Sequence, residues 1–371
     1  MDSLPSRLMT VYRIVRRQHG VRVAPIFLAP IFATIRINVA FFMALDNLFF
    51  PSLRKAKASP IVLVGNPRTG TTFLQRFLAN EGFGSGMELF LMLYPSLVLQ
   101  FFLKPFLPLL EIISPAKFHS TEAHHTSLSS VETDDVSVLF RHFDGFFLYG
   151  FFLSFAEEDM IDAVDPKLRD TNARDFAWLR AVWRRSLVLH GSDRNIAKLF
   201  SLGPRLPEFM EEFPEAKILY TVRDPVSVIP SSMSLVIGVL DKAFGFWDKP
   251  EEVRQQWLDR MYAAWIMLFR RFHDDWTSGR IDRDRVFVVR YDRMMADFDG
   301  LMVDMCAFLD HEPSAEQLAT IKEKADKQRA YKSTHKYDLA KFGLSEEKIR
   351  NDCAFVYETF LPPLEEKATA L

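Results

Sequence analysis

The chain has 371 residues, 49% of them apolar and 25% charged, with a formal net charge of −2. The length fits one large α/β domain or two ordinary ones, and the composition is that of a packed soluble protein. The near-neutral charge argues against a nucleic-acid-binding protein. Cys306 and Cys353 have no CxxC partner or nearby histidine. The sequence therefore predicts neither a zinc site nor a disulfide framework, and a cytoplasmic location.

The first segment, residues 1–56, is expected to be a hydrophobic and basic helical extension. Positions 23–35 are nearly all apolar, but Arg36, Asn38 and Asp46 interrupt the run. A helix that spans a membrane needs about 20 largely uncharged residues, so the segment is marginal for that role. Several arginines precede it, and it starts too far into the chain for an ordinary cleaved signal peptide.

A second apolar stretch, residues 89–113, contains three prolines and Lys104. Prolines break a helix, so a single membrane span is not expected here. Two interpretations are open for both apolar stretches. They form helices of the core, which the sequence favours, or they form an interfacial surface or an apolar channel.

From residue 57 to residue 371, the sequence predicts a single α/β domain with a P-loop-like parallel sheet flanked by helices. Apolar, β-rich runs indicate strands at 61–65, 195–200, 217–222 and 286–290, and helical patterns follow at 71–80, 170–190, 226–240, 250–273 and 294–309. Alternating strands and helices are typical of a parallel sheet with right-handed crossovers. Ligands of such sheets bind at the carboxyl ends of the strands, so the loops there are the candidate site.

The loop after the first strand reads G-N-P-R-T-G-T-T, from Gly65 to Thr72. Free backbone N–H groups at a helix start, with glycines that permit a tight bend, favour a bound phosphate. Gly65 and Gly70 have the spacing of the triphosphate motif G-x-x-x-x-G-K-[ST], but Thr71 replaces its lysine and the cation has moved to Arg68. A kinase or other nucleotide-dependent phosphotransferase is therefore the alternative and not the preferred function.

A second anion-binding pattern follows the strand at 217–222. Arg223 comes directly after the strand, and Ser231 lies eight positions later in the next helix. Arginine presents a planar fork of donors suited to phosphate, and a hydroxyl can complete the shell.

Together, the two motifs resemble those of sulfotransferases that use 3′-phosphoadenosine-5′-phosphosulfate (PAPS). The arginine in P-R-T-G-T-T is similar to that of the bacterial and tyrosylprotein-type branch. This resemblance implies two sets of contacts. The 5′-phosphate and sulfate would contact Arg68, Thr69, Gly70, Thr71 and Thr72, and the 3′-phosphate would contact Arg223, Ser231 and, from a late basic stretch, Lys332 and Lys336.

The resemblance also implies catalytic residues. A glutamate after the first helix is the base of the arginine branch, and Glu88 matches it; its apolar neighbours predict a raised pKa. The histidine pair His124–His125 is the rival base, because an imidazole titrates near neutrality. Lys198, at the end of the second strand, would stabilise the leaving phosphate together with Arg68. Since that phosphate is already a stable leaving group, no metal is required.

The phenylalanine-rich stretch after Glu88 predicts the acceptor. An apolar wall suits a hydrophobic alcohol, phenol or lipid better than a sugar. We therefore expect a small hydrophobic or lipid-like acceptor, peripheral contact with a membrane and no nucleic-acid partner. The sequence does not indicate the oligomeric state. A non-catalytic membrane-surface protein that kept the nucleotide fold is a further interpretation.

Overall fold

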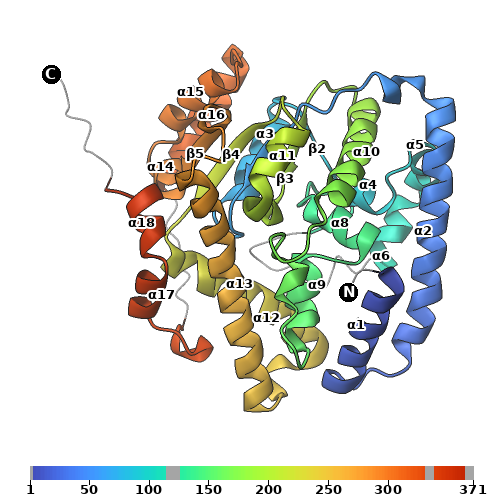
Figure 1. Ribbon diagram of the computed structural model, residues 1–371. Coiled ribbons are helices and arrows are strands. Elements are labelled where there is room, and N and C mark those ends of the chain that lie inside the picture. The colour runs from blue at the N-terminus through green and yellow to red at the C-terminus, as the bar shows by residue number, and fades with distance from the viewer. Residues whose placement is uncertain (1–2, 114–125, 331–337, 364–371) are drawn as a thin grey trace.

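A five-stranded parallel sheet lies at the centre of the molecule (Figure 1). The computed structural model describes residues 3–113, 126–330 and 338–363. In spatial order the strands are β2 (Ser85–Gly86), β3 (Asn195–Lys198), β1 (Ile61–Val64), β4 (Lys217–Val222) and β5 (Val286–Arg290). All neighbours pair in parallel, which confirms the predicted sheet. Only β2 was not predicted from the sequence, because two residues with a glycine leave no apolar run.

Helices cover both faces of the sheet, and this explains the uninterrupted apolar character of β1. Ile61 and Leu63 face a cluster formed with α3 (Thr71–Asn80), α14 (Tyr291–Ala296), α15 (Phe298–Phe308) and α16 (Ala315–Ala330). Val62 and Val64 face the larger core, which includes α10 (Asn172–His190), α11 (Leu206–Glu212), α12 (Pro225–Phe244) and α13 (Glu251–Thr277). The chain ends in α17 (Glu346–Asp352) and α18 (Ala354–Phe360), which pack on α12 and α13.

The apolar stretch 89–113 is divided into short helices at its prolines, as the sequence predicts. It forms α4 (Leu89–Leu93), α5 (Leu97–Leu103), a 3₁₀ turn at Lys104–Phe106 and α6 (Leu107–Ile113). The buried helices α8 (Asp135–His142) and α9 (Phe146–Phe151) follow and lie between this region and α12.

At the N-terminus, α1 (Leu4–Gln18) packs into the main core, whereas α2 (Ala24–Phe49) runs along one edge of the molecule beside α5 (Figure 1). The preferred interpretation of this stretch as a core helix is wrong. An 18-residue window of α2 has a mean hydropathy of 1.9 but is only 11% buried, so the helix is long and apolar enough to cross a membrane. Its inner side is fixed by Asp46, which is fully buried and lies 2.7 Å from Arg185 Nε.

Candidate active site

The loop after β1 is held in a conformation that needs glycine at both ends. Gly65 has φ +140°, and a Cβ there would lie 2.3 Å from the carbonyl oxygen of Thr221 on the neighbouring strand. Gly70 has φ +89°, and a Cβ there would lie 2.3 Å from Cε of Met294. The loop can therefore pass close to β4 and α14 and still lead directly into α3.

Buried hydrogen bonds fix this loop from the inside. Thr69 Oγ1 donates to the carbonyl of Asn66 at 2.7 Å and lies 2.7 Å from the hydroxyl of Thr221. Asn66 Nδ2 donates to the carbonyl of Trp265 at 3.1 Å. The side chain of Thr69 thus has a structural role, and only its backbone N–H remains for a ligand. The first turn of α3 contributes the backbone N–H groups of Thr71 and Thr72. N–H groups in the first turn of a helix have no partner within the helix and favour a bound anion.

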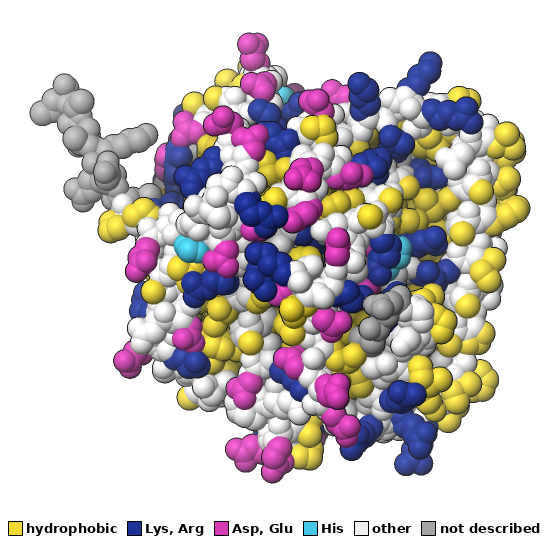
Figure 2. Space-filling model, viewed as in Figure 1, with side chains coloured by type: hydrophobic (Ala, Val, Ile, Leu, Met, Phe, Trp, Pro, Cys, Tyr) yellow, Lys and Arg dark blue, Asp and Glu magenta, His cyan; other side chains and the backbone are white. Residues whose placement is uncertain are grey.

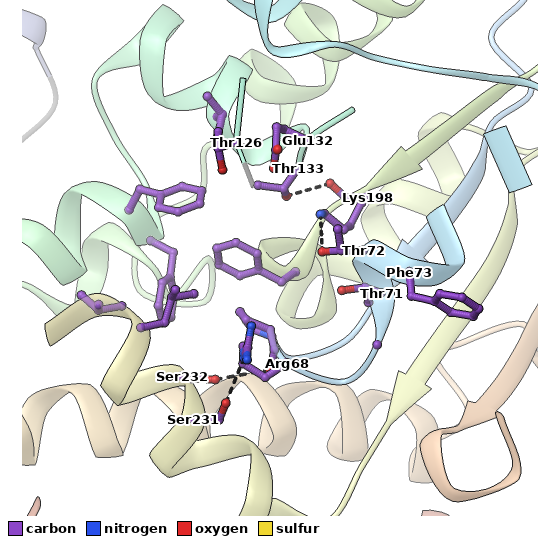
Figure 3. Close-up of a pocket in the computed structure, with 18 of the residues that line it drawn as sticks. Arg68, Thr71, Thr72, Phe73, Thr126, Glu132, Thr133, Lys198, Ser231 and Ser232 are labelled. Carbon is purple, nitrogen blue, oxygen red and sulfur yellow. Dashed lines mark hydrogen bonds between the residues drawn. The ribbon is translucent and has the colours of Figure 1, made fainter. Parts of the chain in front are cut away.

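The second anion motif meets the first. Arg68 Nε donates to Ser231 Oγ at 2.9 Å, although the two residues are 163 positions apart (Figure 3). Arg223 Nη1 donates to the carbonyl of Arg68 at 3.1 Å, and its guanidinium carbon lies 4.1 Å from the centre of the Tyr291 ring. Each arginine is therefore oriented by a residue of the other motif.

Both loops line one cavity of about 1490 Å³. Pockets for a single small ligand measure roughly 300–1,000 Å³, so this one has room for a nucleotide and a second molecule. Its polar lining includes Arg68, Gly70, Thr71, Thr72, Arg76, Glu132, Lys198, Arg223 and Ser231. Its apolar lining includes Leu89, Leu93, Leu139, Phe140, Phe147, Phe151, Phe152 and Phe244.

Lys198 lies at the carboxyl end of β3 and reaches the start of α3. Its Nζ donates to Thr72 Oγ1 at 3.1 Å (Figure 3). Burial lowers the pKa of Lys198 to about 8, against the opposing effect of the Glu132 charge. The ammonium group is thus placed beside the predicted phosphosulfate loop, with a pKa close to neutrality.

An acidic segment, residues 132–135, is held by hydrogen bonds at the same end of β3. Asp134 accepts from the backbone N–H of Lys198 at 2.9 Å and from Trp183 Nε1 at 2.8 Å, and burial raises its pKa to about 7. Thr133 Oγ1 donates to the carbonyl of Lys198 at 3.0 Å. These contacts leave the carboxylate of Glu132 as the acidic group of the segment that lines the cavity.

Glu132 itself is a buried, well-oriented carboxylate. Its Oε1 accepts from Arg76 Nη2 at 3.1 Å and from Ser130 Oγ at 2.8 Å, and its side chain is 8% exposed. In Figure 3 it lies with Thr133 across from Lys198 and Thr72. From the sequence, Glu132, Asp134 and Asp135 are acidic residues that could orient a histidine or bind an acceptor, but the sequence alone does not determine which role they have.

Glu88, the predicted base, does not line the cavity. Its carboxylate lies 3.2 Å from His190 Nε2, and among the described residues Glu132 lines the cavity while Glu88 does not. The expected rise in the pKa of Glu88 is wrong. Partial burial raises that pKa, but the hydrogen bond and charge of His190 outweigh burial and lower it overall. The other candidates, His124, His125, Lys332 and Lys336, lie outside the described residues.

Comparison with known proteins decides between the possible enzyme classes. A family model described as the sulfotransferase family matches residues 60–315, more than half of the chain. The chain belongs to the sulfotransferase family. It is therefore a transferase that takes PAPS as its sulfuryl donor, and the phosphotransferase alternative is not favoured.

Solved structures support the fold of this sulfotransferase. STF9 from Mycobacterium avium superposes with a TM-score of 0.68 at 16% identity, over 86% of this chain and 81% of that one. STF1 from Mycobacterium tuberculosis H37Rv gives 0.66 at 17% identity, over 94% and 91%. No protein of curated function matches the sequence.

The residues of the sulfotransferase cavity fit the donor. The loop bends closely at Gly65 and Gly70, the N-terminus of α3 supplies backbone N–H groups, and Arg68 and Arg223 line the cavity. These are groups suited to phosphate and sulfate. Within residues 3–113, 126–330 and 338–363, no group of three or more His, Cys, Asp or Glu side chains is arranged to hold a metal ion.

Proposed function

We propose that this sulfotransferase transfers the sulfuryl group of PAPS to a hydroxyl or amine of a hydrophobic, lipid-like acceptor. The observation that carries the proposal is the single cavity, in which two anion-binding loops and a wall of phenylalanine and leucine side chains face the same space. A polar acceptor such as a sugar would need more hydrogen-bonding groups than this wall supplies.

In this proposal the two loops hold opposite ends of the donor. Arg68, the backbone of Thr69 and Gly70, and Thr71 and Thr72 bind the 5′-phosphate and sulfate. Arg223 and Ser231 bind the 3′-phosphate. The support is geometric, since Arg68 contacts Ser231 and Arg223 contacts the backbone of Arg68. Lys332 and Lys336 remain predictions for the 3′-phosphate.

We assign the proton-accepting role to Glu132. A carboxylate that lines the cavity can take the acceptor proton while the acceptor oxygen or nitrogen bonds to sulfur. The bond between sulfur and the bridging phosphate oxygen then breaks, and adenosine 3′,5′-bisphosphate leaves. Lys198 and Arg68 stabilise the charge that develops on the departing phosphate. Glu88 and the pair His124–His125 stay predictions as bases, and the position of Glu88 beside His190 favours Glu132 over it.

Transfer of labelled sulfate from PAPS tests the acceptor class. A panel of long-chain alcohols, sterols and phenols is compared with aminosugars of similar size. We expect turnover with the apolar members and little with the sugars. A clear preference for sugars would overturn the proposed acceptor class but not the sulfotransferase activity.

Calorimetry with adenosine 3′,5′-bisphosphate and with ATP, both without metal, separates the sulfotransferase from a kinase, because only a sulfotransferase prefers the bisphosphate.

We also propose that the protein is cytoplasmic and touches a membrane peripherally. A hydrophobic acceptor partitions into a bilayer, so an enzyme that works on its surface meets a higher local concentration of substrate. The side chains that would make this contact are identified below.

A further inference from the structure

Most of the exposed large apolar side chains in the described part of the chain lie in two neighbouring segments. Of the large hydrophobic residues exposed among the described residues, ten lie between Val23 and Phe49 and five between Phe101 and Ile112, against six elsewhere. The first two groups belong to α2, with Val23 directly before it, and to the neighbouring α5–α6 segment; α2 and α5 contact each other. We call these two segments the apolar face. Such a contiguous patch is unusual for a soluble monomer and marks an interaction surface.

The inner side of α2 shows that the helix lies along the protein and does not leave it to cross a bilayer. Asp46 is fully buried, pairs with Arg185, and accepts from the backbone N–H groups of Leu97 and Val98 at 3.1 and 2.9 Å. Extracting α2 would leave a buried charge without its partners, which is strongly unfavourable. The apolar face is therefore presented to its partner as the outer side of a folded unit.

The exposed charges near α2 indicate which kind of partner the apolar face binds. Between residues 3 and 57, the exposed charged side chains are all basic: Arg13, Arg16, Arg17, Arg22, Arg54, Lys55 and Lys57. Asp46, the acid of this segment, is buried, and Arg17 pairs with Glu157. The whole chain has a net charge of −2, so the positive charge is local. The basic residues flank α2 at its two ends, and Figure 2 shows hydrophobic side chains along this edge with Lys and Arg toward both ends.

An apolar stripe with basic residues at both ends matches the surface of an anionic bilayer. Apolar side chains enter the boundary between headgroups and acyl chains, while Lys and Arg contact the lipid phosphates. A second copy of the chain would bring the same positive charges against each other, since a two-fold interface places like patches together. The charge pattern therefore favours lipid over self-association.

The apolar face is also the outer side of the wall around the cavity. Leu103, Leu107 and Leu110 of the α5–α6 segment pack on the buried cluster of Leu89, Phe90 and Leu128, and Leu93 packs on the same cluster. Leu89 and Leu93 line the cavity. A bilayer on the α5–α6 segment would therefore be separated from the apolar part of the cavity by this layer of side chains.

We propose that the apolar face, α2 together with α5–α6, docks the enzyme in the plane of an anionic membrane. The protein then binds the bilayer from one side, with α2 parallel to the surface and its flanking arginines and lysines on the headgroups. This docking does not depend on the donor chemistry, so it holds or fails separately from the proposed reaction.

Co-sedimentation of the full-length protein with vesicles tests the proposal. Vesicles of phosphatidylcholine are compared with vesicles that also contain phosphatidylglycerol, at low and high salt. We expect binding to the anionic vesicles that weakens with salt. The double variant F27E/I31E places two charges on adjacent turns of α2, where both side chains are more than half exposed, and should weaken binding at least about tenfold.

The matched control is V303E/L318E, which adds the same charge at exposed apolar positions on α15 and α16, away from the apolar face. It should bind vesicles as the wild type does. Both variants should keep the wild-type melting temperature and affinity for adenosine 3′,5′-bisphosphate. The proposal is overturned if the wild type does not bind anionic vesicles or if F27E/I31E binds them as strongly as the control does. It is also overturned if light scattering shows a lipid-free dimer that F27E/I31E converts to a monomer.

Discussion

At the scale of single residues, the proposed base is the first point to test. Replacing Glu132 by glutamine removes the proton acceptor and should lower kcat by about 10²–10⁴-fold. The affinity for adenosine 3′,5′-bisphosphate, measured by calorimetry, should change little. Glu88→Gln is the matched control, because that carboxylate bonds to His190 and does not line the cavity. Glu88→Gln should retain the wild-type rate.

The opposite pattern, a large loss of rate in Glu88→Gln and none in Glu132→Gln, would return the role of base to Glu88. Glu132 also pairs with Arg76, so melting temperatures of both variants are needed to show that a lost rate is not lost folding.

Lys198 makes a second residue-scale prediction, a pH dependence. Its pKa is lowered to about 8 by burial, so its ammonium group is protonated below that pH and neutral above it. If the charged form stabilises the leaving phosphate, kcat/KM should fall about tenfold per pH unit as the pH rises above 8. In Lys198→Arg the cation stays protonated, so the rate should be lower but this alkaline decline should disappear. An unchanged decline in Lys198→Arg would show that another group titrates.

At the scale of elements, we propose that the loop between β1 and α3 determines donor binding. Gly65→Ala places a Cβ 2.3 Å from the carbonyl of Thr221, which belongs to the sheet and cannot move aside. The loop must shift, and we expect the affinity for adenosine 3′,5′-bisphosphate to fall at least about tenfold. Gly279→Ala is the control, because Gly279 also has a positive φ but has no atom within 4 Å of its added Cβ. If Gly65→Ala and Gly279→Ala lose the same affinity, the loss is caused by backbone strain and not by the contact with Thr221.

The elements also show how far the sequence could predict the structure. The strands β1, β4 and β5 follow from their apolar runs, and both anion motifs from short local patterns. The acidic cluster that includes Glu132 is visible in the sequence, but its place in the cavity is not, because it depends on Thr133 contacting Lys198, 65 positions away. The exposure of α2 could not be predicted either. Apolar composition alone does not distinguish a helix covered by protein from one covered by another partner.

At the scale of the whole molecule, the fold separates two tasks around one cavity. The carboxyl ends of the strands supply the cations and N–H groups for a charged donor, and α4, α8, α9 and α12 supply the apolar lining for an acceptor. The apolar face lies behind that lining. Under the proposed function, a water-soluble donor and a membrane-soluble acceptor would approach one reaction centre from opposite sides.

The central claim is that the two anion loops hold opposite ends of one nucleotide. Calorimetry with adenosine 3′,5′-bisphosphate and with adenosine 5′-monophosphate, on the wild type and on Arg223→Ala, tests it most directly. The wild type should prefer the bisphosphate, and Arg223→Ala should lose that preference while it keeps the wild-type affinity for the monophosphate. If Arg223→Ala instead weakens both nucleotides equally, or if the wild type does not distinguish them, Arg223 does not hold the 3′-phosphate and the account is contradicted.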